Sequence, residues 1–186
     1  MTSTLIAIAA AAEQGKGATP ITAPIAFIDL EASGLSTGSW PVEVGWCFLT
    51  GRATAMLIKP ADHWSDAAWD PDAEALHRLS RGMLDRKGLA PAKVCEAMNT
   101  ALAGAAVYSD APDWDGFWLY RLFDAAKMRR TFDLLNFADL LAPVSPDDFQ
   151  AAKAQAQKKT PHKHRAKDDV LHMRALYGLV SAGRAP

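Results

Sequence analysis

The chain has 186 residues, of which 49% are hydrophobic and 22% charged, and its formal net charge is −1. This length suits one domain with a full hydrophobic core and excludes two domains of ordinary size. The near-neutral charge excludes a binder that relies on a strong positive field, although an enzyme with a local basic track stays open. Cys47 and Cys95 form no CxxC pair and no metal-ligand spacing, so both are interpreted as apolar residues of a reducing compartment.

The first 20 residues contain an apolar run over 5–12, yet no Lys or Arg precedes Lys16. A secretory signal needs positive charge before its apolar core, and a membrane span needs roughly 20 apolar residues. We therefore expect a flexible N-terminal arm over residues 1–20, with a short helix against the domain as the alternative. A single domain is expected over residues 21–184. No membrane partner is expected, and a cytoplasmic location follows by default.

Three strands are expected at the start of the domain. The apolar run over 25–28 ends on Asp29 and is typical of a central strand that is buried on both faces. Two further strands are expected over 42–49 and 53–58, joined by a hairpin connection at residues 50–52. Consecutive strands with short connections indicate an antiparallel meander.

Helices and strands alternate in the rest of the chain. Apolar side chains recur at three- and four-residue intervals in five segments, which predicts helices over 70–79, 90–102, 117–128, 147–157 and 168–180. Short apolar runs predict two more strands, over 105–108 and 131–135. This order of elements indicates an α/β or α+β domain with a mixed sheet.

Two carboxylates are expected on one face at the end of the first strand. Asp29 and Glu31 stand two residues apart in the string FIDLEASGL, so both side chains project to the same side. Like charges at this separation repel unless a cation lies between them, and hard ions such as Mg²⁺ or Mn²⁺ suit an oxygen-only site. The alternative is a pair of solvated side chains, because D-x-E at a strand end also occurs by chance.

The string YSDAPDWDGFWL joins a short strand to a helix. Asp115 is expected at the helix start, where the helix dipole favours a carboxylate. Simple N-capping is the alternative to metal binding for Asp115 and for its neighbours Asp110 and Asp113. Trp114 is expected on the loop side of this helix, where it is the best candidate to stack on a nucleobase.

The string HKHRAKDDVLHMRALYGL places His164 five residues before Asp169, close to the start of the last helix. A histidine beside a metal-bound carboxylate suits general-base work near neutral pH. His162 and His172 are competitors for that role, with His172 interpreted as a structural or surface residue of the helix. A cluster of basic residues surrounds His164 and predicts either a phosphate track or a solvated loop: Lys153, Lys158, Lys159, Lys163, Arg165 and Lys167.

Taken in order, these three motifs resemble those of the DEDD 3′–5′ exonucleases, in the branch with a histidine in the last motif. That DnaQ-like branch includes polymerase proofreading subunits and ribonuclease T, and the resemblance extends over residues 25–182. It implies a ribonuclease H-like fold, in which strands 1–3 are antiparallel and two later strands add in parallel to complete a five-stranded sheet flanked by helices. It also implies hydrolysis at the 3′ ends of single-stranded DNA or RNA, with release of nucleoside monophosphates.

The resemblance also assigns roles to the matching residues. His164 would accept a proton from the attacking water, and two Mg²⁺ or Mn²⁺ ions would be held by four carboxylates with Asp29 bridging: Asp29, Glu31, Asp115 and Asp169. Residues that match substrate contacts, or that belong to the stacking and basic features above, are Ser33, Gly34, Leu35, Glu43, Trp114, Lys163 and Arg165. Relatives such as ribonuclease T dimerise, which leaves a homodimer open.

The chain departs from the family pattern in places that affect substrate preference. Relatives often carry His-Asn-x-x-Phe-Asp in the second motif, whereas here Ala111 replaces the asparagine and Trp114 the phenylalanine. In the last motif Lys167 stands where an apolar residue is usual. None of these changes removes a metal ligand, so a non-catalytic nucleic-acid-binding module on the same fold is the weaker alternative. DNA and RNA are not distinguished by these residues.

A haloacid dehalogenase-like phosphohydrolase is a second alternative from another class. Its D-x-D-x-T pattern needs an aspartate at position 31 and a threonine at position 33, where this chain has Glu31 and Ser33. The sequence therefore favours a nuclease over this class of hydrolase.

Overall fold

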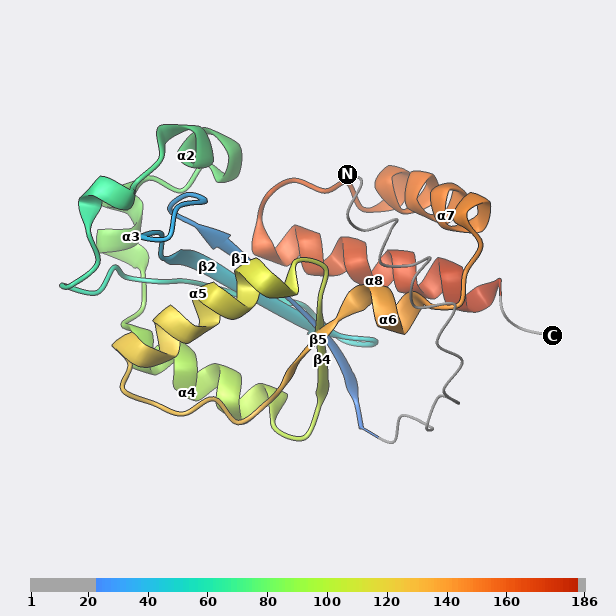
Figure 1. Ribbon diagram of the computed structural model, residues 1–186, viewed down its shortest axis with the longest axis horizontal. Helices are drawn as coiled ribbons and strands as arrows, with labels where there is room; N and C mark the ends of the chain where they lie inside the picture. The colour runs from blue at the N-terminus through green and yellow to red at the C-terminus, as the bar shows by residue number, and fades with distance from the viewer. Residues whose placement is uncertain (1–22, 184–186) are drawn as a thin grey trace.

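The computed structural model describes residues 23–183, and the arm expected over residues 1–20 lies outside this range. A five-stranded sheet in the order β3-β2-β1-β4-β5 forms the centre (Figure 1). β1 (Ile25–Ala32), β2 (Pro41–Phe48) and β3 (Thr54–Leu57) are antiparallel neighbours. β4 (Ala106–Ser109) is parallel to β1, and β5 (Leu134–Asn136) is parallel to β4. The predicted mixed sheet of the ribonuclease H-like type is confirmed.

β1 is the central strand because its apolar run is covered on both faces. Ala26 and Ile28 point into one hydrophobic cluster and Phe27 into another, and all three are completely buried. Side chains alternate between the two faces of a strand, so Asp29 and Glu31 follow Phe27 on its face. This alternation sets both carboxylates on the side of the sheet that carries the second cluster.

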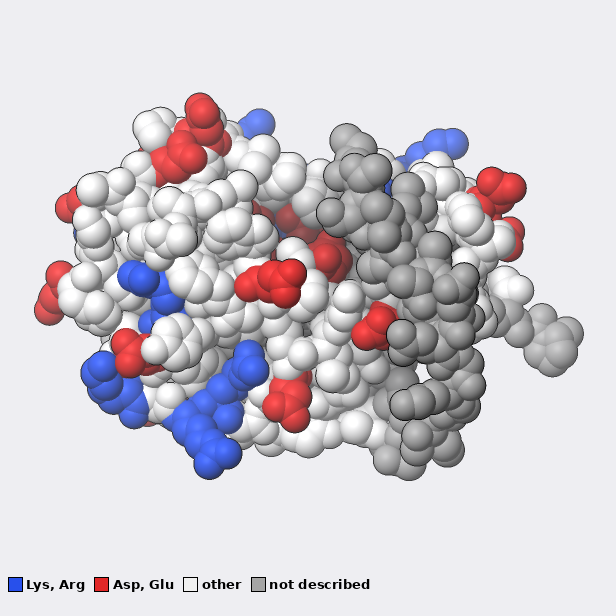
Figure 2. Space-filling model, in the orientation of Figure 1, with Lys and Arg blue, Asp and Glu red and all other residues white. Residues whose placement is uncertain are grey.

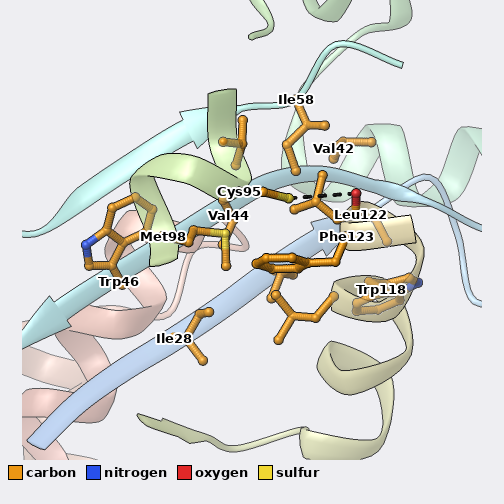
Figure 3. Close-up of a cluster of buried hydrophobic side chains, with 14 of the residues drawn as sticks. Ile28, Val42, Val44, Trp46, Ile58, Cys95, Met98, Trp118, Leu122 and Phe123 are labelled. Atoms are coloured by element: carbon orange, nitrogen blue, oxygen red, sulfur yellow. Dashed lines mark hydrogen bonds between the residues drawn. The ribbon is translucent and has the colours of Figure 1, made fainter. Parts of the chain in front are cut away.

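Two layers of helices cover the sheet (Figure 1). α4 (Pro91–Leu102) and α5 (Pro112–Ala125) pack over the cluster around Ile28, where the thiol of Cys95 in α4 donates a hydrogen bond to the carbonyl of Leu122 in α5 (Figure 3). The cluster around Phe27 packs under three helices near the C-terminus: α6 (Phe137–Leu141), α7 (Pro146–Lys159) and α8 (Ala166–Ala182). In the described part of the chain, no helix is long and apolar enough to cross a membrane.

The connection between β3 and α4 differs from its prediction. The helix expected over 70–79 is α2 (Pro71–His77), preceded by the short 3₁₀ turn η1 (Asp66–Ala68). It ends early because Arg78 takes a left-handed conformation with φ 60°. A further helix, α3 (Arg81–Lys87), was not predicted, and it starts where Ser80 accepts a hydrogen bond from the amide of Met83.

Two other elements also correct the sequence analysis. α5 begins at Pro112 and not near residue 117, because proline is favoured in the first turn of a helix, where its missing N–H is not needed. The short helix α6 was not predicted, and Asn136 caps it by accepting a hydrogen bond from Ala138. The early start of α5 matters for the site, because it puts Trp114 and Asp115 inside the first turn of the helix.

Candidate metal centre and active site

Acidic side chains from four elements converge at the carboxyl ends of β1 and β4. Asp29 and Glu31 come from β1, Asp110 follows β4 directly, and Asp115 and Asp169 lie in the first turns of α5 and α8. One oxygen each from Asp29, Asp110 and Asp115 lie within 4.8 Å of one another, and so do one oxygen each from Asp29, Glu31 and Asp169. Figure 2 shows acidic side chains at the bottom of a hollow near the middle of this face.

Asp29 belongs to both carboxylate groups. Its Oδ2 atom is buried and has no hydrogen-bond partner in the described structure, a costly arrangement for a carboxylate oxygen. Burial raises the pKa of Asp29 well above its usual range, and the charges of Asp115, Asp110 and Glu31 add to this effect. A carboxylate that belongs to two all-oxygen groups and has an unpartnered oxygen fits hard divalent cations such as Mg²⁺ or Mn²⁺.

The pKa values of Glu31, Asp110 and Asp115 are also raised. Burial first, and then the charges of Asp169 and Glu43, raise the pKa of Glu31 to about 8. Burial also raises the pKa of Asp115, although the hydroxyl of Ser109 donates a hydrogen bond to its Oδ2 and opposes the shift. Without a cation Glu31 therefore holds a proton near neutral pH, and a bound divalent ion would take its place.

A close approach between β2 and α8 brings Asp169 to the strand carboxylates. Gly45 is the register partner of Asp29 on β2, and a Cβ atom built on it would lie 2.6 Å from the backbone of Ala166. Only glycine leaves room for the first residue of α8 at this point. The start of α8 therefore packs directly on β2, where its first turn can present Asp169 to Asp29 and Glu31.

The loop before α8 is held to Asp169 by its own backbone. The amides of Lys163 and Arg165 donate to Oδ1 and Oδ2 of Asp169, at 3.0 and 3.1 Å. His164, between them, has a left-handed backbone conformation with φ 54°, which residues other than glycine rarely adopt. The Nε2 of His162 lies 3.6 Å from Oδ2 of Asp169. Both histidines thus stand beside the carboxylate that their own loop encloses.

Glu43 and Arg165 contact each other. The guanidinium donates from Nε and Nη2 to the two carboxylate oxygens of Glu43, at 3.0 and 2.7 Å, and the amide of Ala166 donates to Oε2 at 3.0 Å. Glu43 is buried, and its side chain caps the N-terminus of α8. Both residues were expected to contact substrate, and the structure shows that they contact each other at the start of α8.

The loop after β1 is anchored at its first residue and exposed at its third. The buried Ser33 hydroxyl accepts a hydrogen bond from the amide of Trp40 and donates to the carbonyl of Ala68. A Cβ atom on Gly34 would lie 2.9 Å from that of Asp70, so the backbone packs closely on the residues before α2. Leu35 is 69% exposed. Of these three expected substrate contacts, only Leu35 offers a free apolar side chain.

The remaining candidates lie on α5, on α7 and in the loop before α8. Trp114 is in the first turn of α5 and not in a loop, and it stacks on Trp118 with ring centroids 5.4 Å apart. His164 and Lys163 line one cavity of about 450 Å³ with α2 residues. His164 also lines a second cavity of about 450 Å³, with Asp110, His162 and apolar residues of α6 to α8. The lysines of the predicted basic cluster are exposed along α7, the loop before α8 and the first turn of α8.

The sequence analysis did not select Asp110 and His162, which the structure brings to the centre. β4 is in parallel register with β1, with Phe27 opposite Tyr108, and extending this register by two residues sets Asp110 beside Asp29. A carboxylate directly after a parallel strand was therefore the signal for Asp110. His162 carried a weaker signal, its H-x-H spacing to His164.

Comparisons with known proteins show the fold. Exonuclease I of E. coli in complex with a dA16 oligonucleotide aligns with a TM-score of 0.68 at 15% identity, over 88% of this chain and 42% of that chain. Exonuclease I from Methylocaldum szegediense gives a TM-score of 0.65 at 16% identity, over 88% of this chain and 41% of that one. The chain shares its fold with exonuclease I.

The likeness to exonuclease I includes a zinc-bound form of the E. coli enzyme in complex with single-stranded DNA, with a TM-score of 0.67 at 14% identity. This chain spans about two fifths of the length of those exonuclease I chains. No family model and no curated protein matches the sequence. The comparisons therefore show the fold, and any proposal about the chemistry has to be argued from the side chains of the site.

Proposed function

We propose that the chain is a metal-dependent 3′–5′ exonuclease that hydrolyses phosphodiester bonds at the 3′ ends of single-stranded nucleic acid and releases nucleoside monophosphates. The observation that carries this proposal is the place of Asp29 in two carboxylate groups at once, with a buried oxygen that no protein donor reaches. One carboxylate shared between two oxygen groups suits a pair of divalent ions. The fold shared with exonuclease I bound to an oligonucleotide supports the same class of substrate.

The metal ligands are Asp29, Glu31, Asp115 and Asp169, and Asp110 is a further ligand of the group with Asp115. When bound, two Mg²⁺ or Mn²⁺ ions would neutralise the charge that develops on the attacking and leaving oxygens of an in-line displacement. The protein contributes a rigid set of oxygens on two strand ends and two helix starts. Such preorganised groups lower the barrier because they need no rearrangement during the reaction.

His164 is the general base in this proposal. A ring nitrogen of His164 takes the proton from the water that attacks the phosphorus, and the bond to the 3′-oxygen of the preceding nucleotide breaks. The two amide hydrogen bonds to Asp169 on either side of His164 hold the imidazole near the carboxylates. Glu43 and Arg165 act as positioning residues, because their pairing fixes the start of α8.

Substrate contacts are proposed on either side of His164. The exposed side chain of Leu35 and the backbone of Ser33 and Gly34 face the terminal nucleotide, and Trp114 offers an aromatic face to a base. Lys163 is exposed beside His164 and is placed to contact a phosphate. A homodimer, as in ribonuclease T-like relatives, is compatible with these assignments.

The test uses 5′-labelled single-stranded DNA and RNA oligonucleotides with Mg²⁺, Mn²⁺ or EDTA. Wild type should give a ladder of products shortened from the 3′ end, and EDTA, Asp115→Asn and His164→Ala should each abolish it. Asp113→Asn is the matched control, since Asp113 is exposed in the same helical turn and belongs to neither carboxylate group. If wild type binds both polymers and leaves them intact with either metal, the non-catalytic binding module replaces this proposal.

A further inference from the structure

Near the carboxylates lies a donor group of different chemistry. A ring nitrogen of His162, one of His164 and an oxygen of Asp169 all lie within 4.8 Å of one another. The two imidazole rings meet edge to face with centroids 4.7 Å apart. Two nitrogens and one oxygen are a poor set for Mg²⁺, which takes oxygen ligands, and a good one for Zn²⁺ and its neighbours in the transition series.

The loop geometry holds these donors together. Asp169 is buried in the first turn of α8, and it accepts the amides of Lys163 and Arg165 through its two oxygens. These two hydrogen bonds lie on either side of His164, which has a left-handed backbone conformation. The Nε2 of His162 lies 3.6 Å from Oδ2 of the same carboxylate. Both histidines line a cavity of about 450 Å³, which provides an entry path for an ion.

We propose that His162, His164 and Asp169 form a binding site for Zn²⁺ or a similar late transition-metal ion, and that its occupation inhibits hydrolysis. A ring nitrogen that donates its lone pair to an ion cannot accept a proton from water. The same ion would draw Asp169 away from the group that it forms with Asp29 and Glu31. The inhibitory part of this inference rests on the proposed function, whereas the binding part does not.

Neither the two cysteines nor His172 competes for the ion. Cys47 and Cys95 are buried, and each donates a hydrogen bond to a backbone carbonyl, that of Val170 and that of Leu122. His172 is near His162, with ring centroids 5.8 Å apart, but its Nδ1 lies 2.7 Å from the carbonyl oxygen of Thr160. The triad is therefore the group that zinc would select.

The binding test uses untagged, full-length protein titrated with Zn²⁺ in a calorimeter in the presence of excess Mg²⁺. One Zn²⁺ per chain should bind, and His162→Ala should weaken this binding at least about tenfold, the loss usual for weakened metal sites. His63→Ala is the control, because His63 is exposed and belongs to none of the donor groups. X-ray absorption fine structure of the wild-type zinc complex should show imidazole scattering. Equal affinity in wild type and His162→Ala, or a complex without imidazole ligands, would overturn the site.

The inhibition test measures shortening of a labelled oligonucleotide with excess Mn²⁺ while Zn²⁺ is raised. Each variant is compared with its own rate without zinc, and His162→Ala should need at least about tenfold more zinc than wild type or His63→Ala for half inhibition. Equal zinc sensitivity in wild type and His162→Ala would refute the inhibitory role. If wild type cuts nothing even without zinc, the proposed function fails, and the calorimetry alone decides whether the zinc site exists.

Discussion

Glu31 and Glu43 are register partners on the antiparallel strands β1 and β2, and Arg165 interacts with both. Like charges directly opposite each other on a sheet are destabilising. Arg165 relieves this repulsion by forming a bidentate pair with Glu43, and its charge lowers the pKa of Glu31 against the larger effect of burial. Arg165, a residue of the last motif, thus allows Glu31 and Glu43 to lie opposite each other on β1 and β2.

Removing the guanidinium should therefore destabilise the whole domain. Arg165→Ala leaves the buried Glu43 carboxylate without its cation, and we expect the free energy of unfolding to fall by about 2–3 kcal/mol. This is the lower part of the range for buried pairs, because the Arg165 side chain is 41% exposed. Urea denaturation followed by circular dichroism measures the change.

Two further variants separate the ion pair from other effects of Arg165. Lys163→Ala removes an exposed cation from the same loop, and we expect it to change the free energy of unfolding by less than about 0.5 kcal/mol. Adding Glu43→Gln to Arg165→Ala removes the stranded charge and should recover part of the loss. A double variant that is no more stable than Arg165→Ala would contradict this account.

The metal-free protein should lose stability as the pH rises from 7 to 8.5. Glu31 has a pKa of about 8 in the fold against 4.5 when unfolded, so over this window the folded state binds more protons than the unfolded state. Stability then falls with pH by about 1 kcal/mol per unit for this group. The buried His77 works in the opposite direction, because burial lowers its pKa below 6.5, but that effect fades above the unfolded pKa of 6.5 and is small at the high end of this window.

Thermal unfolding in EDTA at several pH values in that window tests this prediction. The melting temperature of wild type should fall with pH, and Glu31→Gln should flatten the dependence because it removes the titrating group. Mn²⁺ should raise the melting temperature most at the high end of the window, where the carboxylates are charged. A slope that Glu31→Gln leaves unchanged would show that other groups titrate.

Local patterns in the sequence predicted the sheet and five residues that belong to the donor groups of the site: Asp29, Glu31, Asp115, His164 and Asp169. The apolar run of β1 and the two-residue spacing of Asp29 and Glu31 determine the face on which these carboxylates lie. Nothing local announces that Glu43 pairs with Arg165, 122 positions further along the chain. That contact exists because α8 packs on β2. Packing between segments far apart in the chain leaves no periodic pattern in the sequence from which it could be predicted.

Asp110 could be predicted only in part from the sequence. An apolar strand followed by a carboxylate is a local pattern, but the position of Asp110 beside Asp29 depends on the parallel register of β4 and β1, which is not local. Capping of α5 was the local alternative, and the structure assigns no side-chain cap to that helix. The helix break at Arg78 was hidden for a similar reason, since a left-handed arginine is stabilised by its surroundings and not by its own preference.

Asp110→Asn should lower the rate of oligonucleotide shortening with Mg²⁺ by about 10–100-fold, the usual cost of weakening a metal site. The reason is its position within 4.8 Å of the oxygens of Asp29 and Asp115. Asp113→Asn, an identical change three residues along the chain at a position that belongs to neither carboxylate group, should leave the rate near that of wild type. Equal rates for both variants would exclude Asp110 from the metal centre.

Gly45→Ala should damage the site without touching any residue that carries charge. The added methyl group would lie 2.6 Å from the carbonyl carbon and oxygen of Ala166, and backbone atoms cannot rotate away as a side chain can. β2 and the start of α8 must then separate, at a cost of about 1–3 kcal/mol in stability. Because α8 carries Asp169, we expect a larger effect on rate, about 100-fold for a displacement near 1 Å.

Gly178→Ala is the matched control for this change. Gly178 lies in α8, the helix that Gly45→Ala would displace, and a Cβ atom on Gly178 would meet only open space. Alanine favours a helix over glycine, so this variant should keep its rate and gain up to about 1 kcal/mol of stability. Urea denaturation and the oligonucleotide assay together give both quantities for each variant. A Gly45→Ala protein with wild-type stability and rate would mean that α8 tolerates displacement from β2, and that the contact between Gly45 and Ala166 does not set the position of Asp169.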